Sequence, residues 1–269
     1  MRRAADILDV ISTRTAAGEP FVLATVVRTV AATAAKAGAK AIILPDGTMS
    51  EGWIGGGCAR AAVLKAARDA LAEQGVKAGD EQSGVRFAKN MCPSEGSMDI
   101  FVEPVLPRPQ VIVCGSSPVA VAVADLAGRI GFAVTVCAPA SEQSVFEEAD
   151  RRIEGYALPV EEAPSRYVVV ATQGRGDEAA LLAALAFDVD YVAFVGSRRK
   201  AEVLKRALSD RGIAAERLAR LKAPAGLDLG AITPDEIAIS ILAEIVATRR
   251  GKTARGDAPA SSPTEADGS

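Results

Sequence analysis

The second half of the sequence alternates between short apolar runs and longer segments with helical periodicity. The apolar runs are Val111–Cys114, Ala133–Cys137, Tyr167–Ala171 and Tyr191–Val195. The helical segments are Pro118–Ile130, one from Asp177 to about Ala186, one from Ser197 to about Asp210, and one that starts at Thr233. A strand that is apolar on both faces suits a parallel sheet covered by helices on both sides. The alternation therefore predicts a doubly wound α/β domain.

Three of these helices have recognisable start signals. Asp177 and Ser197 are predicted to cap the helices that begin beside them. Thr233 is followed by proline at the first helical position and by Glu236 at the third, which is the pattern of a capping box.

The first half of the sequence is richer in β-strand signals and predicts a small mixed α/β domain. Predicted strands are Phe21–Val30, Lys40–Leu44, Met49–Ile54 and Met98–Val105. Predicted helices are one around Ile7–Ile11 and one over about Ala59–Glu73. The segment Lys89–Gly96, which contains Cys92, is predicted to be a polar loop between strands.

Prolines 104, 107 and 109 place a domain junction near residues 105–110, because proline interrupts helices and central strands. We therefore expect a first domain over residues 1–106 and a Rossmann-like domain over residues 107–250. Residues 251–269 are rich in Gly, Pro, Ser, Thr and charge, and are expected to form a disordered tail.

The composition excludes several kinds of chemistry. The chain has no histidine, which removes catalytic triads that use a His base and metal sites that use His ligands. Its net charge of −3 gives no basic excess for binding nucleic acid or an anionic membrane. The most apolar run, Val111–Ala124, is interrupted by Gly, Ser and Pro and is not a membrane span. The four cysteines form no C-x-x-C pair, and a reducing cytoplasm is expected.

A phosphate-binding loop is predicted after the first strand of the second domain. Gly115 occupies the first glycine position of the pattern. Ser117 occupies the second, where a glycine normally leaves room for a pyrophosphate to approach the backbone. The second strand ends Cys137-Ala138-Pro139, without the acidic residue that binds an adenosine ribose. We therefore do not expect tight NAD(P) binding, although the helix N-terminus can still hold a phosphate.

Gly55, Gly56, Gly57 and Cys58 lie between a predicted strand and a predicted helix. Three glycines allow a large ligand to approach, and a helix N-terminus stabilises a thiolate, so Cys58 is a candidate nucleophile or soft-metal ligand. The alternative is a glycine-rich turn with a small buried cysteine. Cys92 lies in a polar segment and can converge with Cys58, whereas Cys114 and Cys137 end apolar strands and are expected in the core.

A third cluster is Gly196-Ser197-Arg198-Arg199-Lys200, which follows a strand and opens a helix. Ligands of open α/β sheets bind outside the carboxyl ends of the strands, where three cations can hold a phosphate. The alternative is a solvated helix start.

Several long motifs together resemble the XdhC/CoxI family. They are Ala35–Lys40, Gly52–Cys58, Asp99–Pro104, Thr172–Asp177, Phe194–Lys200 and Ala225–Ala238, in this order between about Phe21 and Arg249. The resemblance implies an accessory factor for molybdenum hydroxylases such as xanthine dehydrogenase and carbon monoxide dehydrogenase. Such a factor binds the molybdenum cofactor, holds it during sulfuration by a cysteine desulfurase, and delivers it to the apo-enzyme.

The resemblance also implies which residues bind the cofactor. They are Gly55, Gly56, Gly57, Cys58, Cys92, Gly115, Ser117, Gln173, Ser197, Arg198 and Arg199. Cys58 is the expected molybdenum contact, a cleft between the domains is the expected location, and a homodimer is the expected assembly. An insertion factor need not turn over a substrate, which suits a chain without histidine. The alternatives are a nucleotide-dependent oxidoreductase with Cys58 as its redox residue, and a scaffold that binds no ligand.

Overall fold

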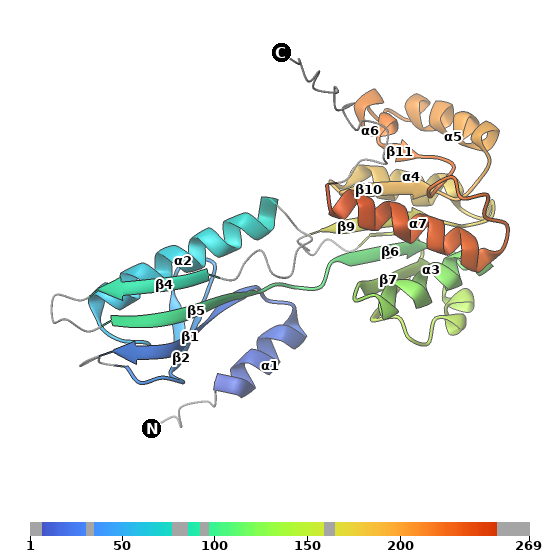
Figure 1. The fold of residues 1–269 in the computed structure, drawn as a ribbon. Coiled ribbons are helices and arrows are strands. Elements are labelled where there is room, and N and C mark those ends of the chain that lie inside the picture. The colour runs from blue at the N-terminus through green and yellow to red at the C-terminus, as the bar shows by residue number, and fades with distance from the viewer. Residues whose placement is uncertain (1–6, 31–34, 77–85, 92–96, 159–164, 252–269) are drawn as a thin grey trace, which may run out of the picture.

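The computed structural model describes residues 7–30, 35–76, 86–91, 97–158 and 165–251. Their strands form one sheet of five strands and one of six, drawn as two separate bodies in Figure 1. The chain leaves the first sheet at Val105 and enters the second at Gln110. The predicted fold class, a small mixed α/β domain followed by a parallel Rossmann-like sheet, is confirmed. The domain limits at residues 106 and 250 stay predictions, and the predicted tail lies outside the described residues after Gly251.

The first sheet is antiparallel and has the order β3-β2-β1-β5-β4. Its elements in chain order are α1 (Ile7–Ala17), β1 (Phe21–Val30), β2 (Lys40–Ile43), β3 (Met49–Gly52), α2 (Gly57–Val76), β4 (Arg86–Met91) and β5 (Ser97–Val105). Helix α2 packs Val63 and Ala67 onto the sheet, against side chains such as Val22 and Ile100. It begins two residues before the predicted start, so Cys58 is its second residue.

The predicted polar loop over residues 89–96 is wrong in its first part. Residues 86–91 form β4, which pairs with β5 from Arg86 opposite Val102 to Met91 opposite Ser97. The polar composition of this segment favoured a solvent-exposed loop. In the structure, its backbone N–H and C=O groups instead find hydrogen-bond partners along the edge of β5. Cys92 and the four residues after it lie outside the described residues.

The second sheet is parallel throughout, with the order β11-β10-β9-β6-β7-β8. Its strands are β6 (Gln110–Cys114), β7 (Ala133–Ala138), β8 (Arg151–Glu154), β9 (Arg166–Val170), β10 (Tyr191–Phe194) and β11 (Leu221–Lys222). Its helices are α3 (Pro118–Arg129), the 3₁₀ helix η1 (Ala140–Val145), α4 (Asp177–Ala186), α5 (Arg198–Asp210), α6 (Ala215–Ala219) and α7 (Pro234–Arg249). The sequence analysis did not predict β8, β11, η1 and α6, which are short.

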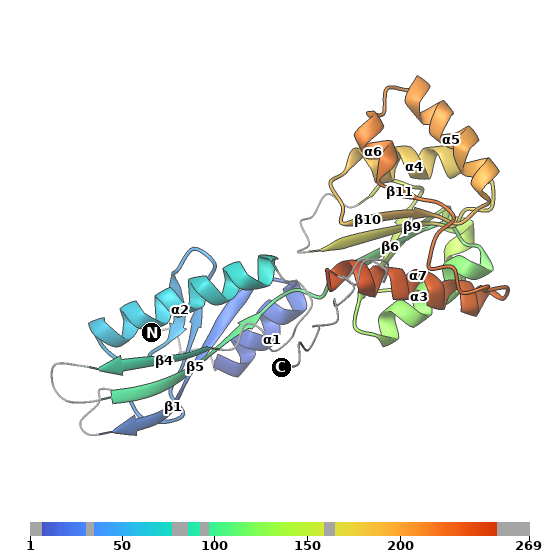
Figure 2. The same cartoon turned by 45° about the horizontal axis from the view of Figure 1, so that its top comes forward.

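Helices cover both faces of the second sheet, as Figures 1 and 2 show. Val111 and Val113 of β6 face the core under α3 and α7, while Ile112 and Cys114 face the core under α4 and α5. Cys114 lies opposite Cys137 in the register of β6 and β7, and both side chains are fully buried. The expectation that these two cysteines are core residues is confirmed.

Candidate functional site

The carboxyl edge of the second sheet gathers most of the predicted binding residues. Strands β6 and β9 are neighbours, yet the chain goes from β6 outward to β7 and β8 before it returns to β9 on the other side. Such a reversal leaves a crevice between the two loops that follow β6 and β9, where open α/β sheets bind ligands. Gly115 and Ser117 follow β6, Gln173 follows β9, and Ser197 follows β10, the next strand along.

Gly115 has no room for a side chain. Its φ of +107° lies in the left-handed region, and an added Cβ would lie 2.6 Å from the carbonyl oxygen of Ala171. Ser117 is buried and caps α3, because its Oγ accepts a hydrogen bond from the Ala120 N–H at 3.1 Å. The serine in the second position of the phosphate loop therefore stabilises the helix as its N-cap.

An acidic side chain that the sequence analysis missed reaches the same loop. Glu142 belongs to η1, beyond the end of β7, and its carboxylate accepts a hydrogen bond from the Ser116 hydroxyl. Its other oxygen lies 3.5 Å from the guanidinium of Arg175, in the loop after β9. Ala138 occupies the position where an acidic residue was sought, and the short 3₁₀ helix η1 brings in Glu142 four residues later. The sequence pattern of β7 does not indicate that the chain turns back and brings an acidic side chain to this loop.

The loop after β9 presents Gln173 to solvent in an unusual conformation. Gln173 has a φ of +49°, a region that residues other than glycine adopt rarely, and its side chain is exposed. Asp177, at the start of α4, fixes the loop beneath it: its carboxylate accepts hydrogen bonds from the Thr172 hydroxyl and, at 3.0 Å, from the Gly174 N–H. The prediction that Asp177 caps α4 is wrong, because Gly176 is the N-cap and the Asp177 side chain points back into the loop.

Asp177 also forms an ion pair with Lys200 of α5, which ties the loop after β9 to the start of the helix after β10. The Asp177 side chain is only 7% exposed. Burial by itself would raise its pKa, but hydrogen bonds from Lys200, Thr172 and Gly174 outweigh burial and lower the pKa. Asp177 is therefore ionised at neutral pH, and the ion pair holds two neighbouring loops of the carboxyl edge together.

We expect Asp177→Asn to lower the free energy of unfolding by about 2 kcal/mol at pH 7, because a buried acceptor of charge-assisted hydrogen bonds is lost. A group with a lowered pKa stabilises the fold above its unfolded pKa, and that stabilisation disappears as pH falls through the folded value. The difference from the wild type should therefore shrink below about pH 4. Urea unfolding between pH 7 and pH 3 measures both effects.

Asp188→Asn is the matched control, because Asp188 pairs with Arg220 at 3.0 Å but is 92% exposed. That change should stay within about 0.5 kcal/mol of the wild type. Equal losses of unfolding free energy in the two variants would show that the buried Asp177–Lys200 pair stabilises the fold no more than the exposed Asp188–Arg220 pair does.

Two residues of the cluster after β10 make contacts that stabilise the fold. Ser197 caps α5, as predicted, with its Oγ accepting from the Lys200 N–H at 3.3 Å. The Lys200 ammonium is bound to Asp177 and lies over the ring of Phe194. Arg198 and Arg199 are exposed in the first turn of α5. Of the three cations proposed for a phosphate, Lys200 is thus paired with Asp177, and the two arginines are the better placed to meet a ligand.

The other predicted group lies on the first sheet. Gly55 is buried with a φ of +121°, and an added Cβ would contact Met98 at 3.5 Å. Gly56 and Gly57 are exposed, and a Cβ added to either would meet no atom within 4 Å. The first N–H groups of a helix lack partners inside the helix, so the start of α2 offers backbone donors beside open space. Cys58 follows directly, as the second residue of α2.

The structure does not bring these two groups of residues together within one chain. In Figures 1 and 2, α2 begins at the end of the first sheet that points away from the second sheet. Strand β6 starts beside the connection between the sheets, so the carboxyl edge lies at its opposite end. The expectation of a single interdomain cleft lined by both groups does not fit this arrangement. Strand β4 ends at Met91 at the end of the sheet where α2 begins, and Cys92 follows it outside the described residues.

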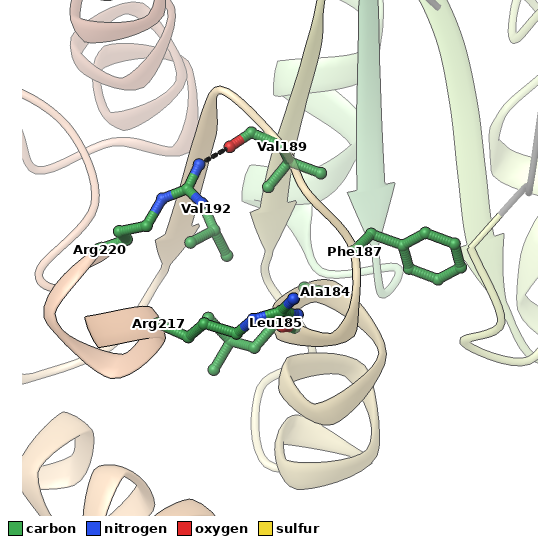
Figure 3. Close-up of a pocket in the computed structure, with 7 residues that line it drawn as sticks. All are labelled: Ala184, Leu185, Phe187, Val189, Val192, Arg217 and Arg220. Atoms are coloured by element: carbon green, nitrogen blue, oxygen red, sulfur yellow. Dashed lines mark hydrogen bonds between the residues drawn. The ribbon is translucent and has the colours of Figure 1, made fainter. Parts of the chain in front are cut away.

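A small hollow elsewhere in the second domain is not a good ligand site. It has an empty volume of about 190 Å³ and lies near the start of β10, at the amino edge of the sheet (Figure 3). Arg217 and Arg220 line it, but their guanidinium groups donate to the carbonyl oxygens of Leu185 and Val189. Binding pockets for small molecules usually enclose about 300–1,000 Å³.

The two remaining cysteines also lie away from solvent. The pKa of the Cys114 thiol is raised by its contact with Cys137 and by burial, while the contact with Cys114 lowers the pKa of Cys137. Both are free thiols. Within the described ranges, no helix has both the length and the apolar character needed to cross a bilayer.

Two family models match the sequence. The model described as the XdhC Rossmann domain matches residues 111–245 of the 269, and the model described as the XdhC and CoxI family matches residues 15–78. The chain belongs to the XdhC and CoxI family. The membership confirms the resemblance that the sequence motifs indicated.

Two curated proteins resemble this XdhC-family chain. One, named Uncharacterized protein YqeB, from Escherichia coli, is 31% identical over 240 residues, which are 84% of this chain and 43% of that protein. The other, named as a probable xanthine dehydrogenase subunit, from Bacillus subtilis, is 31% identical over 160 residues, 56% of this chain and 46% of that protein. The chain thus spans less than half the length of each.

A solved structure described as a xanthine dehydrogenase from Bacillus halodurans is also similar. The similarity extends over 95% of this chain and 98% of that one, with 19% sequence identity and a TM-score of 0.48. A likeness this distant carries no argument about function.

Proposed function

We propose that this chain is an accessory factor that holds the molybdenum cofactor and delivers it to an apo molybdenum hydroxylase of the xanthine or carbon monoxide dehydrogenase type. Membership of the XdhC and CoxI family is the observation that carries the proposal. The relative named as a probable xanthine dehydrogenase subunit supports the same class of client enzyme. Sulfuration by a cysteine desulfurase during the holding step is part of the proposal.

The start of α2 fits the cargo chemically. The cofactor combines soft dithiolene sulfurs and a metal with a phosphate. Gly56 and Gly57 leave open space beside the first N–H groups of α2, where an anion is favoured by the helix dipole. A thiolate is a soft ligand and is favoured at a helix N-terminus, which is the place of Cys58. We assign the metal-bearing part of the cargo to this end of the first sheet.

The carboxyl edge of the second sheet has a different chemistry. Arg198 and Arg199 are exposed there, and Ser117 and Ser197 cap helices that begin there. Guanidinium groups and helix N-termini suit a phosphate, and a nucleotide attached to the cofactor would carry one. Because the two groups of residues face away from each other in one chain, we propose the α2 end as the primary cofactor site.

The test is retention and transfer of cofactor by the purified protein. We expect molybdenum by elemental analysis and pterin by fluorescence after expression in a host that makes the cofactor. We also expect that adding the loaded protein to an apo xanthine dehydrogenase restores hydroxylase activity, and that a cysteine desulfurase increases the recovery. Pterin and molybdenum at the level of an unrelated control protein would contradict the proposal.

We expect NAD and NADP to bind this chain with dissociation constants weaker than micromolar. Ser117 is committed to capping α3, and both oxygens of Glu142 already contact residues of the chain, so a ribose would have to displace Ser116 or Arg175. Isothermal titration calorimetry measures the constant directly. Micromolar or tighter binding would favour the alternative of a nucleotide-dependent oxidoreductase.

A further inference from the structure

Two cysteines face each other near the carboxyl ends of β6 and β7. The two strands lie side by side in Figure 1, and Cys114 is opposite Cys137 in their parallel register. Both side chains belong to the core under α4 and α5, so they point to the same face of the sheet. A hydrogen bond joins the two thiols, and both are free. We call Cys114 and Cys137 the cysteine pair.

The backbone at the cysteine pair suits a disulfide bond. Neighbouring strands of a sheet lie about 4.8 Å apart, and disulfides join residues whose Cα atoms are about 4.4–6.8 Å apart. Just beyond the pair, the Gly115 N–H donates a hydrogen bond to the Cys137 carbonyl oxygen at 2.9 Å, which holds the two strand ends together. The two sulfurs therefore meet without any further approach of the strands.

The Cys137 sulfur lies beneath a segment that is itself at the surface. Its thiol donates a hydrogen bond to the carbonyl oxygen of Ala157 at 3.7 Å, and Ala157 is exposed. Tyr156, one residue earlier, is half-buried and packs on the same core. Cys114 lies deeper in the sheet, because β6 has β7 on one side and β9 on the other. A small reagent that enters past Ala157 therefore meets Cys137 first.

The two thiols differ in acidity. Contact with Cys114 lowers the pKa of the Cys137 thiol, although burial opposes this, and the charge of Arg151 lowers it further. Contact with Cys137 and burial raise the pKa of the Cys114 thiol. The thiolate is the nucleophilic form of cysteine. Cys137 is therefore the sulfur that attacks an oxidant, and Cys114 is the sulfur that reacts second.

We propose that the cysteine pair is a reversible disulfide site that reacts with small hydroperoxides. In the first step, the Cys137 sulfur bonds to one peroxide oxygen and the O–O bond breaks. The other oxygen leaves as water or an alcohol, after taking up the proton that Cys137 released. In the second step, the Cys114 sulfur bonds to the Cys137 sulfur, the S–O bond breaks, and water leaves with the Cys114 proton. Both sulfurs are oxidised and the peroxide is reduced.

In a reducing compartment such a bond is transient, because thiol reductants reverse it by exchange. The proposal does not depend on the proposed function, since neither cysteine belongs to the predicted cofactor-binding residues. A chain that holds no molybdenum cofactor would leave the reaction of the cysteine pair unaffected.

The test is peptide mapping of the folded full chain after treatment with a moderate excess of hydrogen peroxide, acid quenching and alkylation. Trypsin together with a glutamate-specific protease puts each of the four cysteines on its own peptide, since sites such as Glu95 and Arg129 lie between them. We expect the Cys114 and Cys137 peptides to be linked, about 2 Da lighter than their sum, and to separate after dithiothreitol. Free thiols at both positions after treatment would overturn the proposal.

Serine variants test the order in which the two sulfurs react. In Cys114→Ser, the sulfenic acid of Cys137 has no partner sulfur, so dimedone added during unfolding should label it. In Cys137→Ser, we expect at least about 10-fold less label on Cys114, which is deeper and less acidic. Equal labelling would overturn the assigned order. Circular dichroism checks that both variants fold, and the wild-type linkage decides the proposal if either does not.

The double variant Cys58→Ser/Cys92→Ser is the matched control, because it removes the two cysteines outside the pair. It should give the same linked peptides as the wild type and at the same rate. Linkage of Cys114 or Cys137 to either of the other cysteines, or a bond between two chains on a non-reducing gel in place of the internal one, would overturn the proposal.

Discussion

Cys58→Ser is expected to lower the molybdenum and pterin content of the purified protein to background and to abolish reactivation of an apo-hydroxylase. Cys58 is the second residue of α2 and follows two exposed glycines, so a ligand can approach its end of the helix. Serine keeps the size of the side chain and removes the soft thiolate that binds molybdenum or relays sulfur. Elemental analysis, pterin fluorescence and client reactivation measure the loss.

Cys114→Ala is the matched control for this experiment. Cys114 is fully buried in β6 and faces Cys137, so its removal tests the loss of a thiol that cannot meet a cofactor. We expect normal cofactor content and a small loss of stability. Wild-type retention by Cys58→Ser, at unchanged stability, would show that the thiol at the start of α2 is not the cofactor ligand.

Gly115→Ala is expected to be the most destabilising single-methyl change in the second domain. The methyl group would lie 2.6 Å from the Ala171 carbonyl oxygen and 2.7 Å from the Thr172 Cα, both backbone atoms of the neighbouring loop. The positive φ of Gly115 adds strain for any side chain. We expect a loss of at least about 3 kcal/mol in the free energy of unfolding, measured by urea denaturation.

Gly128→Ala provides the comparison, because Gly128 lies within α3 and an added Cβ there would meet only the Val134 side chain, at 3.9 Å. Alanine is favoured over glycine in a helix by up to about 1 kcal/mol, so this variant should be neutral or more stable. A similar loss of unfolding free energy in both variants would mean that the close contact between the added methyl group and the backbone beside Gly115 is not the cause of the destabilisation.

Much of the fold could be predicted because its signals are local. The apolar runs of the second half mark strands buried on both faces, and Ser197 and Thr233 cap the helices that they were predicted to cap. Ser117 caps α3 in the same way, although the sequence analysis treated it only as a departure from the phosphate loop. Such signals depend on hydrogen bonds between residues three positions apart, which the sequence displays directly.

The contacts that shape the candidate site could not be predicted because they join distant residues. Glu142 meets Ser116 across 26 positions, and Asp177 meets Lys200 of the next helix rather than capping its own. The strand β4 depends on an open edge of β5, which no local pattern reports. The separation of Cys58 from the carboxyl edge follows from the direction of whole strands and helices. Family motifs place all these residues in one functional set without stating their positions in space.

The two sheets are built from consecutive stretches of the chain, with every described strand of the first ending by Val105 and every described strand of the second starting at Gln110 or later. During synthesis, the whole first sheet can therefore emerge from the ribosome before translation of α7 begins. At about 5–20 residues per second, the second sheet follows several seconds later. The Cys58 end of the protein can thus acquire its shape, and become competent to meet a partner, on a nascent chain whose second half is still being made.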